Sequence, residues 1–145
     1  ELAIFFLIVQ FSAMIGSLLF GYIGDKLGIL RSIYLNLIIW TLITLAVFFT
    51  NDKMSFYIIG GFAGTFLGSA QALSRTLMTM LTPQEFKTEF FGFYGLFEKT
   101  STILGPLTFG LVSWLSGSQK YAILSIGVFF ILGMLQLKKV KVKEI

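Results

Sequence analysis

The chain has 145 residues, of which 56% are hydrophobic and only 12% are charged, whereas a soluble domain has about 25% charged residues. Apolar stretches this long exclude a soluble globular protein and predict several membrane-spanning helices. The net charge of +4 does not indicate nucleic-acid binding, because much of it comes from a terminal cluster that is typical of an anchor beside a membrane. This cluster consists of Lys138, Lys139, Lys141 and Lys143.

Apolar stretches predict five transmembrane helices in an all-α bundle that occupies residues 1–137, followed by a basic tail, residues 138–145. The predicted spans cover residues 2–23, 32–50, 55–81, 90–115 and 121–137. With a rise of about 1.5 Å per residue, helices of these lengths can cross a hydrocarbon core of about 30 Å. Because the chain begins with Glu1 and not Met, we expect it to be a fragment of a longer protein.

The connectors between the spans alternate between two sides of the membrane. One side holds the connectors at residues 24–31 and 82–89 together with the tail, and it carries seven lysines and arginines. The other side carries two, Lys53 and Lys120. The positive-inside rule therefore predicts that the C-terminus and the connector after the first span face the cytoplasm.

The spans differ in their polar content. The second and fifth are almost bare of polar groups, which predicts that they face lipid. The first, third and fourth carry polar or small residues three and four positions apart, and such residues share one face of a helix. We expect these three faces to meet in a polar interior. They comprise Gln10, Ser17 and Gly21; Gly64, Gly68, Gln71, Arg75 and Thr79; and Tyr94, Glu98, Ser101, Thr102 and Gly105.

Three ionisable side chains, Arg75, Glu98 and Lys99, lie inside predicted spans. A charge near the bilayer centre costs about 2.5–3.5 kcal/mol, so such residues usually mark a binding site or a pathway. Arg75 lies about 9 Å, and Glu98 about 12 Å, from the same side of the membrane, which predicts an ion pair between them, either lasting or broken as the protein changes conformation. Glu98 and Lys99 point about 100° apart and cannot neutralise each other. A static pair that only fixes helix packing is the alternative.

Small residues and a proline shape two of the spans. Gly60, Gly64, Gly68 and Ala72 recur every four residues in the third span, which predicts close packing of a neighbouring helix. In the fourth span, Gly105 and Pro106 predict a kink, either fixed or used in gating, because proline removes a backbone donor.

The connector after the first span, GYIGDKLGILR, resembles the G-x-x-x-D-R-x-G-R-R signature found in each half of the major facilitator superfamily. Ile29 and Leu30 replace two usual basic residues. The resemblance implies a cytoplasmic gate formed by Gly21, Asp25, Lys26, Gly28 and Arg31. We expect Asp25 at the N-terminus of the fourth helix, where the helix dipole stabilises a carboxylate, with Lys26 or Arg31 as its partner.

A second set of motifs is more specific: QALSR at residues 71–75, LTP at 81–83, FFG at 90–92, Tyr94, Lys99 and LGP at 104–106. These motifs resemble the C-terminal half of the autophagy-linked vacuolar amino-acid effluxers and their bacterial relatives. The resemblance implies twelve helices in the full protein, of which these are the eighth to twelfth, and the missing N-terminal half as a partner. It implies the cell membrane for a bacterial source and the vacuolar membrane for a fungal one.

The leading functional hypothesis is a secondary transporter that moves a small polar solute by alternating access; the family resemblance favours an amino acid. Gln71, Arg75, Glu98 and Lys99 would line the central cavity, binding the solute or coupling a proton. A membrane scaffold or receptor of the same fold that transports nothing is the main alternative.

An intramembrane enzyme is disfavoured by the residue types. The chain has no cysteine and no histidine, which removes the commonest metal ligand and general base. Its two aspartates, Asp25 and Asp52, are expected on opposite sides of the membrane, and Ser101 and Lys99 point away from each other on one helix. We therefore expect no enzymatic activity, no metal and no cofactor.

Overall fold

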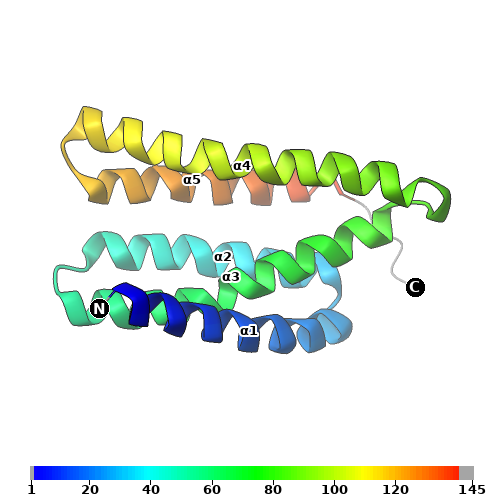
Figure 1. Ribbon diagram of the computed structural model, residues 1–145, viewed down its shortest axis with the longest axis horizontal. Coiled ribbons are helices and arrows are strands. Elements are labelled where there is room, and N and C mark those ends of the chain that lie inside the picture. The colour runs from blue at the N-terminus through cyan, green and yellow to red at the C-terminus, as the bar shows by residue number, and fades with distance from the viewer. Residues whose placement is uncertain (1, 141–145) are drawn as a thin grey trace.

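The structure, a computed structural model, describes residues 2–140 and consists of five long helices (Figure 1). Each predicted span coincides with one helix to within four residues, so the predicted all-α bundle is confirmed. The helices are α1 (Leu2–Leu27), α2 (Ile29–Phe49), α3 (Lys53–Leu81), α4 (Lys87–Ser116) and α5 (Gln119–Leu137), and a short 3-10 helix, η1 (Gln84–Phe86), links α3 to α4.

Four helices of the described part, α1, α2, α3 and α5, are long and apolar enough to cross a membrane. The helix α4 is not among them although it has 30 residues, because Glu98, Lys99 and many small residues lower its hydropathy. Its crossing of the membrane therefore stays a prediction. Large apolar side chains are exposed on every long helix, as is usual for helices whose outer surface contacts lipid.

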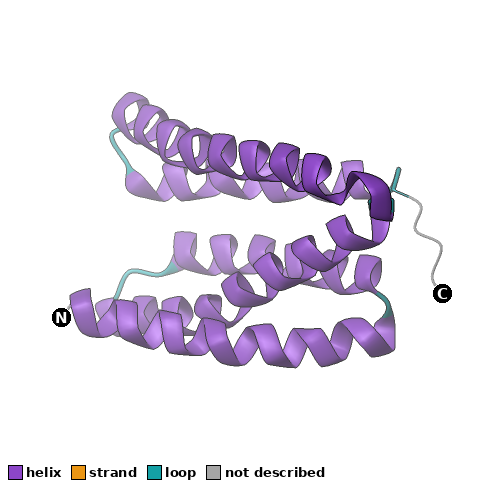
Figure 2. Ribbon diagram, turned by 45° about the vertical axis from the view of Figure 1, so that its right-hand side comes forward, coloured by secondary structure: helices purple, strands orange, loops and turns teal. Residues whose placement is uncertain are grey.

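The helices form a group of three, α1, α2 and α3, beside a hairpin of α4 and α5 (Figures 1 and 2). The helix α1 packs extensively against α3, α2 packs against both α3 and α5, and α4 packs mainly against α5. Where described, α4 makes only slight contact with α3 and none with α1. The hairpin is therefore attached to the rest of the bundle chiefly through α2 and α5.

The closest helix pair, α1 with α3, meets through glycine. A Cβ atom added to Gly16, Gly64 or Gly68 would overlap the backbone of the facing helix, and one added to Gly60 would overlap the ring of Phe5. Only glycine allows such close backbone approach, so the predicted small-residue face is confirmed as a packing surface. The sequence analysis missed its counterpart on α1, Gly16.

A buried polar contact joins α2 to α3. The side-chain amide of Asn36 donates to the hydroxyl of Ser69 and to the carbonyl oxygen of Phe66 at 3.2 Å. The Ser69 hydroxyl donates to the same carbonyl at 2.9 Å. Because Ser32, Asn36 and Thr44 are all buried, the expectation that α2 simply faces lipid is wrong. The helix α2 lies between α3 and α5, and its buried polar residues, Ser32, Asn36 and Thr44, bond to α3 or to its own backbone.

The connectors alternate between the two ends of the bundle (Figure 1). The α1–α2 and α3–α4 connections lie at the same end as the last turn of α5, so Lys26, Arg31, Lys87, Lys138 and Lys139 gather there. The α2–α3 and α4–α5 connections lie at the other end. Lys141 and Lys143, also part of the predicted basic tail, lie outside the described residues.

At the less basic end, α3 begins with a capped turn. The carboxylate of Asp52 accepts a hydrogen bond from the backbone N–H of Ser55 at 2.7 Å. Hydrogen bonds from Ser55 stabilise the charged form and lower the pKa of Asp52. Aspartate is one of the preferred residues at this position because its carboxylate satisfies an N–H that lacks a helical partner. Asp25 lies at the opposite end of the bundle, as expected.

Candidate functional site

The polar faces predicted for the first and third spans meet in one groove between α1 and α3. The groove has a volume of about 620 Å³. It contains Gln10 and Ser17 from α1 and Gln71 and Arg75 from α3, but not Gly21. The remaining lining residues are small or apolar: Leu7, Phe11, Ala13, Met14, Gly68 and Ala72.

The glycine contacts fix how this groove is built. Val9 faces Gly64, and four residues later in both helices Ala13 faces Gly68. The helices α1 and α3 therefore run in the same direction. One turn further along each helix, Ser17 and Ala72 line the groove. Close packing at the glycines thus brings the polar residues of the two helices to a common surface.

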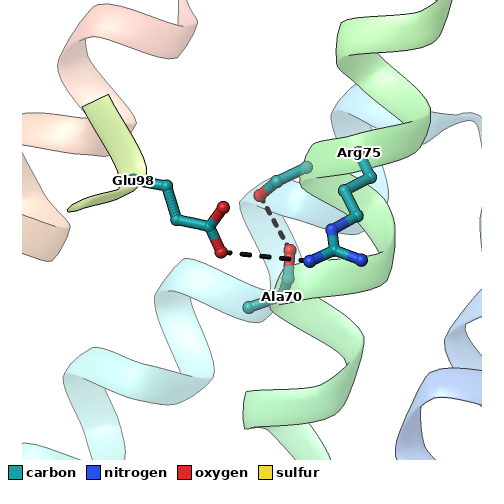
Figure 3. A network of polar contacts seen from close by, with 4 residues as sticks. Ala70, Arg75 and Glu98 are labelled. Atoms are coloured by element: carbon teal, nitrogen blue, oxygen red, sulfur yellow. Dashed lines mark hydrogen bonds and ion pairs between the residues drawn. The ribbon is translucent and has the colours of Figure 1, made fainter. Parts of the chain in front are cut away.

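Arg75 on α3 points across the bundle toward Glu98 on α4 (Figure 3). The distance between Arg75 Nη2 and Glu98 Oε1 is 4.0 Å, so the predicted ion pair is present. The neighbouring hydroxyl of Ser74 donates to the carbonyl oxygen of Ala70 at 2.7 Å and does not compete for either charge. The pair is a bridge between α3 and α4, which otherwise make little contact.

This ion pair is open. A hydrogen bond between nitrogen and oxygen spans about 2.7–3.2 Å, so a separation of 4.0 Å lies beyond it. The side chains of Arg75 and Glu98 are 63% and 42% exposed. In water, unit charges at this distance attract each other by about 1 kcal/mol. Both groups therefore keep hydrogen-bonding capacity that a third group can use.

The other residues predicted around this cluster differ in their placement. Gln71 lies one turn from Arg75 and lines the same groove. Lys99 is exposed, does not line the groove, and forms no ion pair with the described residues. The helix α4 continues through Gly105 and Pro106 to Ser116, and the kink predicted there stays a prediction.

The connector predicted as a gate is a single residue, Gly28, between α1 and α2. Its φ of 86° and ψ of 145° lie in a region that only glycine adopts readily. The N–H of Gly28 donates to the carbonyl oxygen of Gly24, and Ser32 donates back to the carbonyl of Gly28. Gly28 is thus required by the backbone. Gly21 is not, because a Cβ there would meet nothing within 4 Å.

Asp25, Lys26 and Arg31 line a second, polar depression of about 360 Å³ at this end of the bundle. Thr76 and Met80 of α3 complete the wall of this depression. Thr76 directly follows Arg75 in the sequence. The depression lies between α1, α2 and α3.

Asp25 does not make the contacts expected for it, with the start of α4 and with Lys26 or Arg31. Within residues 2–140, α1 makes no contact with α4, so the expectation that Asp25 lies at the start of α4 is wrong. No ion pair joins Asp25 to Lys26 or Arg31 in the described chain; the Lys26 ammonium lies 4.5 Å from the centre of the Tyr22 ring.

Comparison with known proteins decides the family. A family model described as "Vacuole effluxer Atg22 like" matches residues 1–144. The chain belongs to this family. The resemblance noted in the sequence motifs is thereby confirmed. Together with the four apolar helices, membership of the Atg22-like family identifies the chain as an integral membrane protein.

Relatives of this Atg22-like chain occur in bacteria and fungi. It is 29% identical over 134 residues to an uncharacterized MFS-type transporter, YxiO, of Bacillus subtilis, a match that covers 92% of this chain and 31% of YxiO. It is 27% identical over 139 residues to Autophagy-related protein 22 of Kluyveromyces lactis, covering 88% of this chain and 28% of that protein. The chain therefore spans less than a third of either relative. No solved structure matches it.

Sequence reasoning missed two parts of this candidate site. The first is the apolar wall of the groove, Leu7, Phe11 and Met14, which lies next to the polar face of α1. The helical spacing of these residues around Gln10 was the available signal. The second is the Asn36–Ser69 contact, which holds α2 against the helix that carries Arg75. An isolated asparagine in an apolar span signals such a contact but does not identify its partner.

Proposed function

We propose that this chain is the C-terminal part of a secondary transporter that moves a small polar solute, with an amino acid favoured, by alternating access. The observation that carries the proposal is the groove between α1 and α3. It holds Gln10, Gln71 and Arg75, with Glu98 facing Arg75 from α4. Ionisable groups within apolar helices are costly, and they are usually retained where they line a solute or ion pathway.

The residues have distinct roles in this proposal. Gln71, Arg75 and Glu98 bind the solute or couple a proton to its movement. Lys99, on another side of α4, lines the part of the cavity that the missing N-terminal half completes. That half is the main protein partner, and the lipid bilayer surrounds both.

The depression that contains Asp25, Lys26 and Arg31 serves as the cytoplasmic gate. Two features support this role: the loop resembles the superfamily signature, and the depression reaches Thr76, which is adjacent to Arg75. The excess of basic residues at this end of the bundle supports a cytoplasmic position of the C-terminus.

The experiment that tests the proposal uses the purified full-length protein in liposomes. Uptake of a panel of labelled amino acids is measured with and without a pH gradient, and protein-free liposomes give the background. Saturable uptake above this background is expected, and stimulation by the gradient would identify a proton as the coupling ion. Binding of an amino acid without any flux would instead indicate a receptor.

A further inference from the structure

The Arg75–Glu98 pair has the geometry of a binding site. Each side chain takes the place beside the other that an oppositely charged group of a ligand would take. The guanidinium and the carboxylate face each other across 4.0 Å from two different helices. Neither side chain forms a hydrogen bond with the described residues, although arginine offers five N–H donors and a carboxylate accepts several bonds. A purely structural pair in a membrane protein would gain from closing this distance with direct hydrogen bonds.

We infer that Arg75 and Glu98 form a two-point clamp for a solute that carries a carboxylate and an ammonium group close together. Arg75 binds the carboxylate and Glu98 binds the ammonium. This inference rests on the proposed function, and it adds which charge of the solute each side chain recognises. It also assigns Gln71 as a positioning residue, since its amide lies in the groove one turn from Arg75.

Charge balance favours a solute with both groups. When the ion pair opens within the membrane, each side chain needs a new partner or water, because an unpaired charge within an apolar span is costly. A solute with only a carboxylate would satisfy Arg75 and leave Glu98 unpaired, and a solute with only an ammonium would do the reverse. A zwitterion satisfies both and leaves the net charge of the site unchanged.

The placement of Arg75 favours it as the carboxylate subsite. Its guanidinium can hold a carboxylate through two parallel hydrogen bonds, a geometry that lysine cannot offer. Arg75 lies at the lining of the groove, which also contains the amides of Gln10 and Gln71. Glu98 does not line the groove, and it faces Arg75 from α4. The bound solute would therefore replace the ion pair as the link between α3 and α4.

The test measures binding to the purified full-length protein in detergent, using thermal stabilisation as the readout. Each of the common amino acids is tested, and for those that bind, the amide and the N-acetyl derivative are compared with the parent. The amide lacks the carboxylate, and the N-acetyl derivative lacks the ammonium. Both are expected to bind at least tenfold more weakly than the parent. Absence of binding by every amino acid, or equal binding of either derivative, overturns the clamp.

Two variants assign the subsites. In the Arg75→Gln variant, the parent amino acid is expected to bind as weakly as its amide, so that the preference for a free carboxylate disappears. In the Glu98→Gln variant, the parent amino acid is expected to bind no more tightly than its N-acetyl derivative. If the pair only fixed helix packing, both variants would change thermal stability and leave these preferences intact. Lys138→Gln and Glu89→Gln are the controls, because each removes one charge of the same sign at an exposed position away from the pair.

The outcomes separate the clamp from the transport proposal. Binding with the expected preferences but without uptake in liposomes would support the clamp and overturn transport. Uptake of a solute that lacks one of the two charges, at a rate equal to that of the zwitterion, would support transport and overturn the clamp. Failure of both measurements overturns both.

Discussion

Asn36 of α2 donates its side-chain amide to the hydroxyl of Ser69 of α3, and both residues are almost completely buried. A buried polar group is stable only when it is hydrogen-bonded. This contact therefore ties α2 to the helix that carries Gln71 and Arg75, six residues or less beyond Ser69. It supports the site without touching it.

Substitution of Asn36 by alanine is expected to destabilise the full-length protein by about 0.6–2 kcal/mol, the range for interhelical hydrogen bonds and buried polar groups. The Ser69 hydroxyl keeps its bond to Phe66 in this variant. Thermal unfolding in detergent measures the loss. Ser125→Ala is the matched control, because the Ser125 hydroxyl bonds only to a carbonyl of its own helix; an equal loss in both variants would contradict the prediction.

Replacing Gly68 by alanine is expected to cost about 1–3 kcal/mol, the usual penalty for overpacking. The new methyl group would overlap the backbone of Ala13. Gly61→Ala, on the same helix, is the control, because a Cβ there would lie 3.5 Å from the nearest atom, a methyl carbon of Ile8. We expect Gly61→Ala to be neutral or stabilising, since alanine favours the helix by about 1 kcal/mol. The midpoint of thermal unfolding should therefore fall in Gly68→Ala and stay the same or rise in Gly61→Ala.

Gly28 is expected to tolerate no other residue. Its φ of 86° with ψ of 145° is a conformation that costs other residues about 1–3 kcal/mol. Asparagine, which often replaces glycine in left-handed turns, should not rescue it because ψ is far from the left-handed helical value. Gly21→Ala, within α1, serves as the comparison, and it should be neutral or stabilising, because a Cβ there would meet nothing within 4 Å. Circular dichroism melts of Gly28→Ala, Gly28→Asn and Gly21→Ala check this order.

The cap at Asp52 predicts a pH dependence on the acid side. The folded state lowers the pKa of this carboxyl below its usual value of 3.8. The stabilisation is therefore complete above the unfolded value and is lost as the pH falls through the folded one. Asp52→Asn should keep a cap, since asparagine is also preferred there, but should remove this dependence. Stability measured between neutral and strongly acidic pH distinguishes the variants; identical acid profiles would contradict the assignment.

Glu98→Gln is expected to reduce uptake by the full-length protein and to flatten its pH dependence, because the variant can neither take up a proton nor pair with Arg75. The initial rate of uptake in liposomes across a series of pH values is the measurement. Glu89→Gln, on the same helix, controls for the loss of a carboxylate. Unchanged uptake with an unchanged pH profile would remove Glu98 from the coupling role.

The helices could be predicted from the sequence because each is a long apolar stretch, and the Arg75–Glu98 pair could be predicted from the cost of burying charge in lipid. Two expectations were wrong for one reason. The burial of Asn36 and the distance between Asp25 and α4 depend on which helices become neighbours. That choice is made by side-chain packing between segments far apart in the chain, and the composition of a single span does not contain it.

The glycine contacts at Gly16, Gly64 and Gly68 determine which movements remain open to the site. Backbones in direct contact cannot slide or part without losing that contact along several turns, so α1 and α3 behave as one rigid unit. A movement that opens or closes the proposed pathway would then involve the other helices. Within residues 2–140, α4 contacts α3 only slightly, through the short η1 connection and the Arg75–Glu98 pair, and it packs mainly against α5; the α4–α5 hairpin is therefore the part least constrained by the α1–α3 contact.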